Sequence, residues 1–152
     1  MYKLEKIAQV IVLIAFIILL VKACSSQLFG SVEVYEVIEA IEKVESNQNP
    51  YALNIAENAK GSLQIREIMI DDYNRITNQN FPHDIAYNRA FAWLVAREIF
   101  YHYMQGIENP TAKHLAFIWN GGGSAWKRVD NPKNDQKQKN LDLYWEKVKL
   151  HL

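Results

Sequence analysis

The chain has 152 residues, of which 49% are hydrophobic and 22% charged, and its formal net charge is zero. This length fits one domain with a core of its own, and the composition excludes a disordered protein. The balanced charge gives no indication of a nucleic-acid-binding protein, although residues 127–149 are locally basic.

Residues 1–24 are predicted to be a signal or membrane-anchor segment. Residues 7–21 are apolar except for Gln9. This run is short for a membrane span, which needs about 20 residues, and suits the apolar core of a secretory signal of about 7–15 residues. Lys3 and Lys6 favour a cytoplasmic amino terminus. We therefore expect the segment to contact the membrane and the remainder to lie on the extracytoplasmic side of the cell envelope.

Cys24 is the only cysteine, so no disulfide can form within the chain. Its place after the apolar run and Ala23 resembles a bacterial lipoprotein signal, in which this cysteine is acylated. Lys22 departs from that pattern, because a small uncharged residue usually stands there. An uncleaved anchor, a lipidated cysteine and an incidental cysteine after a cleaved signal all remain open.

The exported part is predicted to be all-α. Residues 25–31 form a linker with Ser31 as a candidate helix cap, and residues 32–152 form the domain. Apolar residues recur there at three- and four-residue steps. They predict helices over about 32–45, 63–76, 84–105, 110–119 and 141–148. No strand-like alternation longer than three or four residues appears.

Loops and caps complete this prediction. Asn109 followed by Pro110 predicts a helix start, with Asn as the cap and Pro at the first helical position. The glycines of residues 120–124 predict a tight turn. Residues 47–60 and the polar residues 129–140 are predicted to be loops.

Glu45 is the first candidate for chemistry. Its position continues the apolar stripe of Val34 and Ile41, which points it toward the core. Carboxylates are rarely buried without a reason, and burial raises the pKa of a carboxyl group toward the range that a general acid needs near neutral pH. The alternative is a carboxylate at the end of a helix that turns back to solvent.

Three short segments carry a resemblance. They are residues 45–54, which begin Glu-Ser-Asn-Gln-Asn-Pro, residues 61–65, Gly-Ser-Leu-Gln-Ile, and residues 119–123, Trp-Asn-Gly-Gly-Gly. In this order and spacing, with Tyr144 later, they resemble the lytic transglycosylases of the soluble, goose-lysozyme-like superfamily. The resemblance covers residues 32–148. It implies a lysozyme-like helical domain that cuts the MurNAc-GlcNAc β-1,4 bond of peptidoglycan glycan strands and leaves anhydro-muramyl ends.

The resemblance also implies roles for single residues. Glu45 matches the catalytic acid, and Ser46 matches a residue that orients the substrate or the acid. Gln64 and Asn120 match cleft residues that bind the sugar. Two further matches are Gly121, where the backbone approaches the ligand, and Tyr144, whose hydroxyl holds the acid. Trp119 departs from the family's usual Tyr.

The family's single-carboxylate reaction leaves hydrolysis open as an alternative. In the resembling enzymes the substrate's own N-acetyl group replaces the second carboxylate that other glycosidases use. Asp71 and Asp72 are candidates for a second carboxylate, although Asp72 could instead pair with Arg75 or Arg66. A lysozyme-type hydrolase and a non-catalytic peptidoglycan-binding or assembly protein are the competing interpretations.

No metal or other cofactor is expected. The four histidines have no metal-like spacing and no partnering cysteine pair.

Overall fold

The structure is a computed structural model that describes residues 34–152. The predicted signal or anchor segment, the linker and the Ser31 cap lie outside the described residues. Within residues 34–152 no helix is both long enough and apolar enough to cross a membrane.

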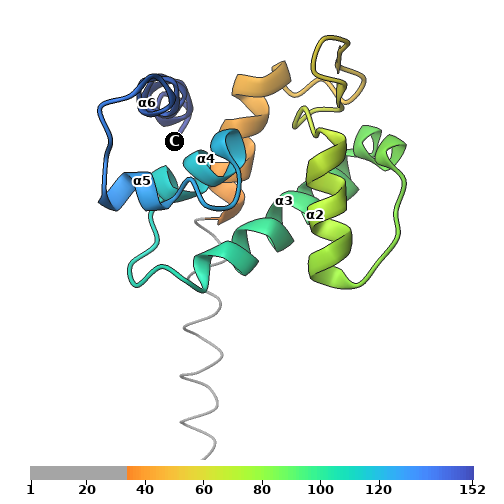
Figure 1. The fold of residues 1–152 in the computed structure, drawn as a ribbon. Coiled ribbons are helices and arrows are strands. Elements are labelled where there is room, and N and C mark those ends of the chain that lie inside the picture. The colour runs from red at the N-terminus through yellow and green to blue at the C-terminus, as the bar shows by residue number, and fades with distance from the viewer. Residues whose placement is uncertain (1–33) are drawn as a thin grey trace, which may run out of the picture. The chain divides into compact units, whose positions relative to one another are not determined.

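The described part is mainly helical, as the sequence predicts (Figure 1). It begins with a helix over residues 34–46, which we call the first described helix. The elements that follow are β1 (Leu53–Asn54), β2 (Ala59–Lys60), α2 (Glu67–Thr77), the 3-10 helix η1 (His83–Tyr87), α3 (Arg89–Met104), α4 (Ala112–Gly121), α5 (Lys127–Asp130) and α6 (Gln136–Lys149). The two short strands pair antiparallel, with Leu53 opposite Lys60, and were not predicted from the sequence.

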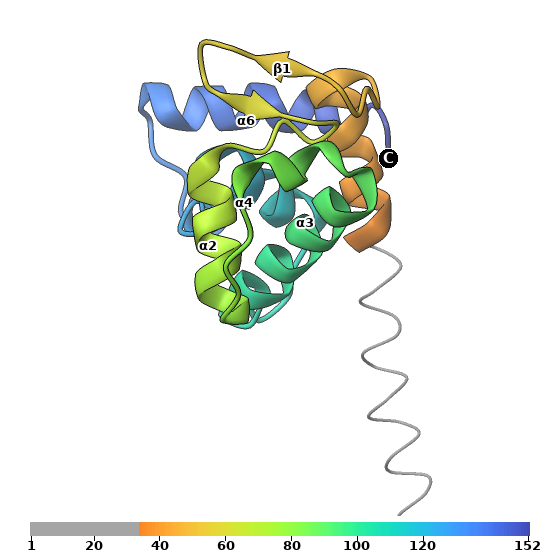
Figure 2. The same cartoon turned by 90° about the vertical axis from the view of Figure 1, so that its right-hand side faces the viewer.

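The core lies between the first described helix, α3 and α4. Val37, Ile38 and Ile41 are fully buried, which confirms the apolar stripe predicted for the first helix. Phe100 of α3 packs edge-on against Trp119 of α4, with ring centroids 5.8 Å apart. Burying an aliphatic or aromatic side chain stabilises a fold by about 1.5–3 kcal/mol, so these faces hold the helices together. In Figure 2 the hairpin runs across one end of the domain, above α2 and α3.

Two predicted helices begin later than their apolar spacing indicates. α2 starts at Glu67 rather than at residue 63, because Leu63 is buried in a loop instead of on a helix face. The segment predicted as one helix over 84–105 is divided into η1 and α3 at Asn88. The side chain of Asn88 accepts a 3.1 Å hydrogen bond from Phe91 N–H and so starts α3 anew.

The predicted start of α4 was wrong. Asn109 is not the cap and Pro110 is not the first helical residue, because Thr111 occupies the cap position and the helix begins at Ala112. The backbone N–H of Thr111 donates a 3.1 Å hydrogen bond to Nδ1 of His114. His114 therefore fills the place that Glu or Gln takes in a capping box. The usual capping-box sequence pattern does not include histidine at this position.

The loop predicted over 129–140 is too long. α5 and the first turn of α6 occupy most of it, and α6 begins at Gln136 rather than at Leu141. Asp135 caps α6 by accepting a 2.7 Å hydrogen bond from Gln138 N–H, and Arg128 holds the same carboxylate at 2.9 Å. The cap at Asp135 allows the first turn of α6 to form from polar residues, although these residues lack the apolar periodicity that predicts a helix.

Gly61 fixes the loop that follows the hairpin. Its φ is +75°, and a Cβ at this position would lie 2.0 Å from the carbonyl oxygen of Ala86. Only glycine fits both the backbone angle and the space. The loop carries Gln64, so this close approach positions a candidate site residue.

Candidate active site

Glu45 lies in the last turn of the first described helix and lines a polar cavity of about 420 Å³, which we call the acid cavity. Its side chain is partly buried. Burial raises the pKa of Glu45, and the charges of Glu57 act in the same direction, whereas Tyr144, Arg66 and Lys147 lower it. The net shift is upward, so the carboxyl group holds its proton at a higher pH than a solvated glutamate does.

Tyr144 orients this carboxyl group. Its hydroxyl donates a 2.6 Å hydrogen bond to Glu45 Oε1, and its ring is buried against the core by α6. Burial, together with the neighbouring carboxylate, raises the pKa of Tyr144 well above its usual value. The phenol therefore stays protonated and serves as a donor over the whole working range.

Glu42, one turn before Glu45, has the opposite environment. It is completely buried, and Arg89 donates to both of its carboxylate oxygens at 2.8 and 2.6 Å. Trp93 Nε1 donates a third hydrogen bond of 3.1 Å. Burial acts to raise the pKa of Glu42, but these hydrogen bonds outweigh it and the pKa is lowered. Glu42 is thus a charged structural residue, and Glu45 is the carboxyl group poised to carry a proton.

Gln64 and Asn120 line the acid cavity together with Glu45 and Tyr144. Gln64 has a φ of 48°, and its side-chain amide donates a 2.9 Å hydrogen bond to the Gly61 carbonyl. That bond fixes the side chain within the turn. Asn120 is exposed near the carboxyl end of α4, and among the described residues its side-chain amide has no hydrogen-bond partner. Four of the six predicted site residues therefore meet in one cavity.

Ser46 and Gly121 are placed elsewhere. The hydroxyl of Ser46 donates to the Ser62 carbonyl at 2.7 Å and accepts from Asn49 N–H at 3.0 Å, which ties the end of the first helix to the loop that carries Gln64. Gly121 lines neither of the two cavities described here. A Cβ on it would lie 2.7 Å from Ala125 Cβ, so close helix packing explains this glycine better than contact with a ligand.

The acid cavity has wall residues that the sequence interpretation missed. Three of them are charged: Glu57 in the turn between β1 and β2, Arg66 before α2, and Lys147 on α6. In Figure 1 the hairpin and α6 lie on opposite sides of the first described helix, and both contribute to the cavity wall. Only the fold brings these charges together, because they belong to three elements far apart in the chain.

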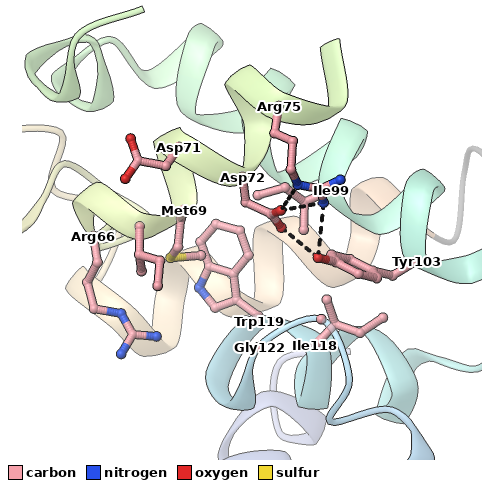
Figure 3. Close-up of a pocket in the computed structure, with 12 residues that line it drawn as sticks. Arg66, Met69, Asp71, Asp72, Arg75, Ile99, Tyr103, Ile118, Trp119 and Gly122 are labelled. Carbon is pink, nitrogen blue, oxygen red and sulfur yellow. Dashed lines mark hydrogen bonds and ion pairs between the residues drawn. The ribbon is translucent and has the colours of Figure 1, made fainter. Parts of the chain in front are cut away.

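A second cavity of about 410 Å³ adjoins the first (Figure 3). The two share Arg66, Met69 and Trp119 as lining residues, and we call the two adjoining cavities together the groove. Trp119, noted only as a departure from the family pattern, thus stands at the junction. The groove is polar beside Glu45 and is bounded farther along by Ile68, Ile99 and Ile118.

Asp72 lines this second cavity as part of a hydrogen-bonded cluster. Arg75 binds Asp72 Oδ1 at 2.6 Å, which confirms one of the two ion pairs predicted from sequence. The Tyr103 hydroxyl donates to Asp72 Oδ2 at 2.9 Å. Asp71 lines the same cavity, and neither aspartate lines the acid cavity. The nearby Gly123 leaves room for the Tyr103 ring, since a Cβ would lie 2.0 Å from it.

Metal chemistry has no obvious donor set in this part of the chain. Within residues 34–152 no group of three or more His, Cys, Asp or Glu side chains could hold a metal ion. His114 is engaged by Thr111 and by Asp130, whose carboxylate lies 3.2 Å from its Nε2. Among the described residues, the groove offers instead a partly buried carboxyl group, amide groups and two cations without an ion pair.

A scan against protein-family models, a search of curated proteins and a search of solved structures found no match to this chain.

Proposed function

We propose that this protein is a lytic transglycosylase with a lysozyme-like fold, and that it cuts the β-1,4 bond between N-acetylmuramic acid and N-acetylglucosamine in peptidoglycan. The observation that carries the proposal is the single cavity lined by Glu45, Gln64, Asn120 and Tyr144. It combines a partly buried carboxyl group of raised pKa with amide groups suited to an amino sugar.

Glu45 is the proton donor of the first step. Its carboxylic acid gives a proton to the glycosidic oxygen, and the bond from this oxygen to C1 of the muramyl sugar breaks. The acetamido oxygen of the same sugar stabilises the positive charge left at C1. Tyr144 holds the resulting Glu45 carboxylate through its 2.6 Å hydrogen bond and keeps it beside the sugar.

Glu45 then acts as the base of the second step. The carboxylate takes the proton from the 6-hydroxyl of the muramyl sugar, and the 6-oxygen bonds to C1. The products are a 1,6-anhydro-muramyl end and a free 4-hydroxyl on the departing sugar, and Glu45 is protonated again. No water is consumed, so one carboxyl group is sufficient.

The arrangement of the two cavities supports a polymeric substrate. Two cavities of about 420 and 410 Å³ share lining residues and run past Glu45 toward Asp72. Two adjoining cavities, one of which holds the proposed proton donor, suit neighbouring sugar units of a glycan strand.

Hydrolysis is the second candidate, and Glu57 favours it. Glu57 is exposed and lines the same cavity as Glu45. The Asn54 side chain accepts hydrogen bonds from Ala56 N–H and Glu57 N–H at 3.1 and 3.3 Å, which fixes the turn that carries it. A second carboxyl group beside the acid is what a hydrolytic glycosidase uses. In this case Glu57 would activate a water molecule or stabilise the sugar cation.

We place the protein at the cell envelope. Residues 1–24, as a signal or membrane anchor, would hold the domain on the extracytoplasmic side, where its substrate lies. Lipidation of Cys24 is the alternative means of attachment.

The test is a gel that contains purified cell wall. The full-length chain should leave a cleared band after renaturation, and Glu45→Gln should leave none. Glu39→Gln is the matched control, since Glu39 is an exposed carboxylate on the same helix, and it should clear the gel like the wild type. Binding of cell wall without clearing by the wild type would favour the non-catalytic peptidoglycan-binding protein.

A further inference from the structure

Arg66 stands out among the five arginines of the chain. The other four, Arg75, Arg89, Arg97 and Arg128, each form an ion pair at 2.6–2.9 Å. Within residues 34–152 the guanidinium group of Arg66 has no carboxylate within 4.0 Å and no hydrogen bond from its side chain. It is nevertheless partly buried and lines both halves of the groove.

Figure 3 makes the difference between Arg66 and Arg75 visible. Arg75 reaches into the cluster with Asp72 and Tyr103, whereas Arg66 lies on the other side of the Trp119 ring, away from that cluster. Arg66 is the extended cap residue that leads into α2, and its side chain lines the groove. A planar guanidinium at a groove wall is suited to bind a carboxylate through two parallel hydrogen bonds.

Lys147 adds a second cation to the same enclosure. It lines the acid cavity from the last turn of α6, and among the described residues it has no ion pair. Glu57 and Glu45 are the carboxyl groups that line this cavity. Among the described residues, neither of them lies within 4.0 Å of Arg66 or Lys147 in an ion pair. The cavity therefore presents two cations that no described carboxylate engages directly.

We infer that Arg66 and Lys147 bind a carboxylate of the glycan substrate and make the groove selective for muramyl strands over neutral chitin. The inference rests on the proposed function and specifies which part of the substrate these residues recognise. N-acetylmuramic acid carries a lactyl carboxylate, and when a stem peptide is attached the carboxylates belong to the peptide. Chitin has the same β-1,4 linkage and acetamido groups but no carboxylate.

The test measures binding rather than turnover. Glu45→Gln in the full-length chain serves as the inactive background, and three tetrasaccharides are titrated by calorimetry: a peptide-free GlcNAc-MurNAc tetrasaccharide, the same glycan with stem peptides, and chitotetraose. Adding Arg66→Gln should weaken binding of a carboxylate-bearing glycan about tenfold or more, as expected for loss of a charge-assisted hydrogen bond. Chitotetraose should bind unchanged, which also shows that the variant is folded.

Matched variants sharpen the result. Lys147→Gln should act in the same direction as Arg66→Gln. Lys149→Gln is its control, because Lys149 lies two residues along the same helix and lines neither cavity, and it should have no effect. A loss confined to the peptide-free glycan would identify the lactyl carboxylate as the bound group. A loss confined to the peptide-bearing glycan would identify the stem peptide.

Two outcomes would overturn the inference: an equal loss for all three ligands, or no loss for any of them. These outcomes are separable from failure of the proposed function. A protein that clears cell wall but shows no charge selectivity would retain the function and lose this inference. Selective binding without clearing would retain the inference for a glycan-binding protein.

Discussion

Tyr144 and Glu45 are 99 positions apart in the chain, and the hydroxyl of Tyr144 donates a 2.6 Å hydrogen bond to Glu45 Oε1. This contact joins α6 to the end of the first described helix at the wall of the acid cavity. Burial raises the pKa of Glu45 and the hydrogen bond partly offsets that rise. The hydrogen bond from Tyr144 therefore influences both the orientation of the Glu45 carboxyl group and its pKa.

Tyr144→Phe should raise the pKa of Glu45 further, because the hydrogen bond stabilises the ionised form. Since Glu45 must be protonated to donate, the alkaline limb of the kcat/KM profile should move to higher pH. The rate at the optimum should fall about fivefold, as expected for a hydrogen bond worth about 1 kcal/mol. The measurement is the rate of cell-wall solubilisation as a function of pH.

Tyr101→Phe is the control for this prediction, because Tyr101 lies on α3 and lines neither cavity. Its profile should coincide with that of the wild type. A limb that stays in place in Tyr144→Phe would contradict the role given to the hydroxyl.

Glu45→Gln should stabilise the fold at neutral pH. The folded-state pKa of Glu45 is raised, so as pH rises above the ordinary value of 4.5 the unfolded chain releases its proton first and folding becomes less favourable. Glutamine cannot ionise and avoids this loss. Urea titrations measure the free energy of unfolding of both proteins. The value for Glu45→Gln minus that for the wild type should be larger at pH 7 than at pH 4.

A stability gain of Glu45→Gln that is the same at both pH values, or that is greater at pH 4, would contradict a raised pKa of Glu45 in the folded protein. Glu39→Gln supplies the comparison with an exposed carboxylate of the same helix.

Arg89→Gln should destabilise the fold more than Glu42→Gln does. Glu42 is fully buried whereas Arg89 has 51% of its side chain exposed. Removing the arginine leaves a buried carboxylate without its cation, at a cost of about 3 kcal/mol, whereas removing the carboxylate leaves a cation that water can solvate. Urea unfolding at pH 7 measures both. The reverse order would show that Arg89 is not the main partner of Glu42.

The pH dependence of the Glu42 contribution has the opposite sign to that of Glu45. Because the pKa of Glu42 is lowered on folding, its stabilisation is present above the ordinary value of 4.5 and is lost as pH falls through the folded-state pKa. The cost of Arg89→Gln should therefore shrink in acid, where Glu42 is neutral.

Gly61→Ala should be far more damaging than Gly122→Ala. Both glycines have positive φ, +75° and +87°, so each substitution introduces backbone strain of about 1–3 kcal/mol. At Gly122 a Cβ has no atom within 4 Å, but at Gly61 it lies 2.0 Å from a backbone oxygen. We expect Gly61→Ala to lose an additional 1–3 kcal/mol or more from the clash. Equal losses in thermal or urea unfolding would argue against the close approach of Ala86.

The sequence predicted the parts of the fold that depend on local pattern. The stripe from Val34 to Ile41 and the buried residues Leu115 and Trp119 follow helical periodicity, and the structure confirms them. Helix starts were less well predicted, because they depend on caps. Asp135 and the unusual cap partner His114 move two helix starts away from the positions that Leu141 and Pro110 indicate.

The candidate site divides in a similar way. The positions of Glu45, Gln64, Asn120 and Tyr144 were chosen from short segments, and they line one cavity. Glu42 was overlooked as a buried carboxylate because its partner Arg89 is 47 positions away. Glu57 and Arg66 were overlooked for a related reason, since their place in the groove depends on how the hairpin and α2 pack rather than on any spacing near Glu45.

Mass analysis of the fragments released from purified peptidoglycan tests whether Glu45 supplies the proton that breaks the glycan strand. The wild type should release muropeptides with 1,6-anhydro-muramyl ends, Glu57→Gln should release the same products, and Glu45→Gln should release none. Reducing ends from the wild type that disappear in Glu57→Gln would replace transglycosylation by hydrolysis. Undiminished release of fragments by Glu45→Gln would show that Glu45 is not the proton donor.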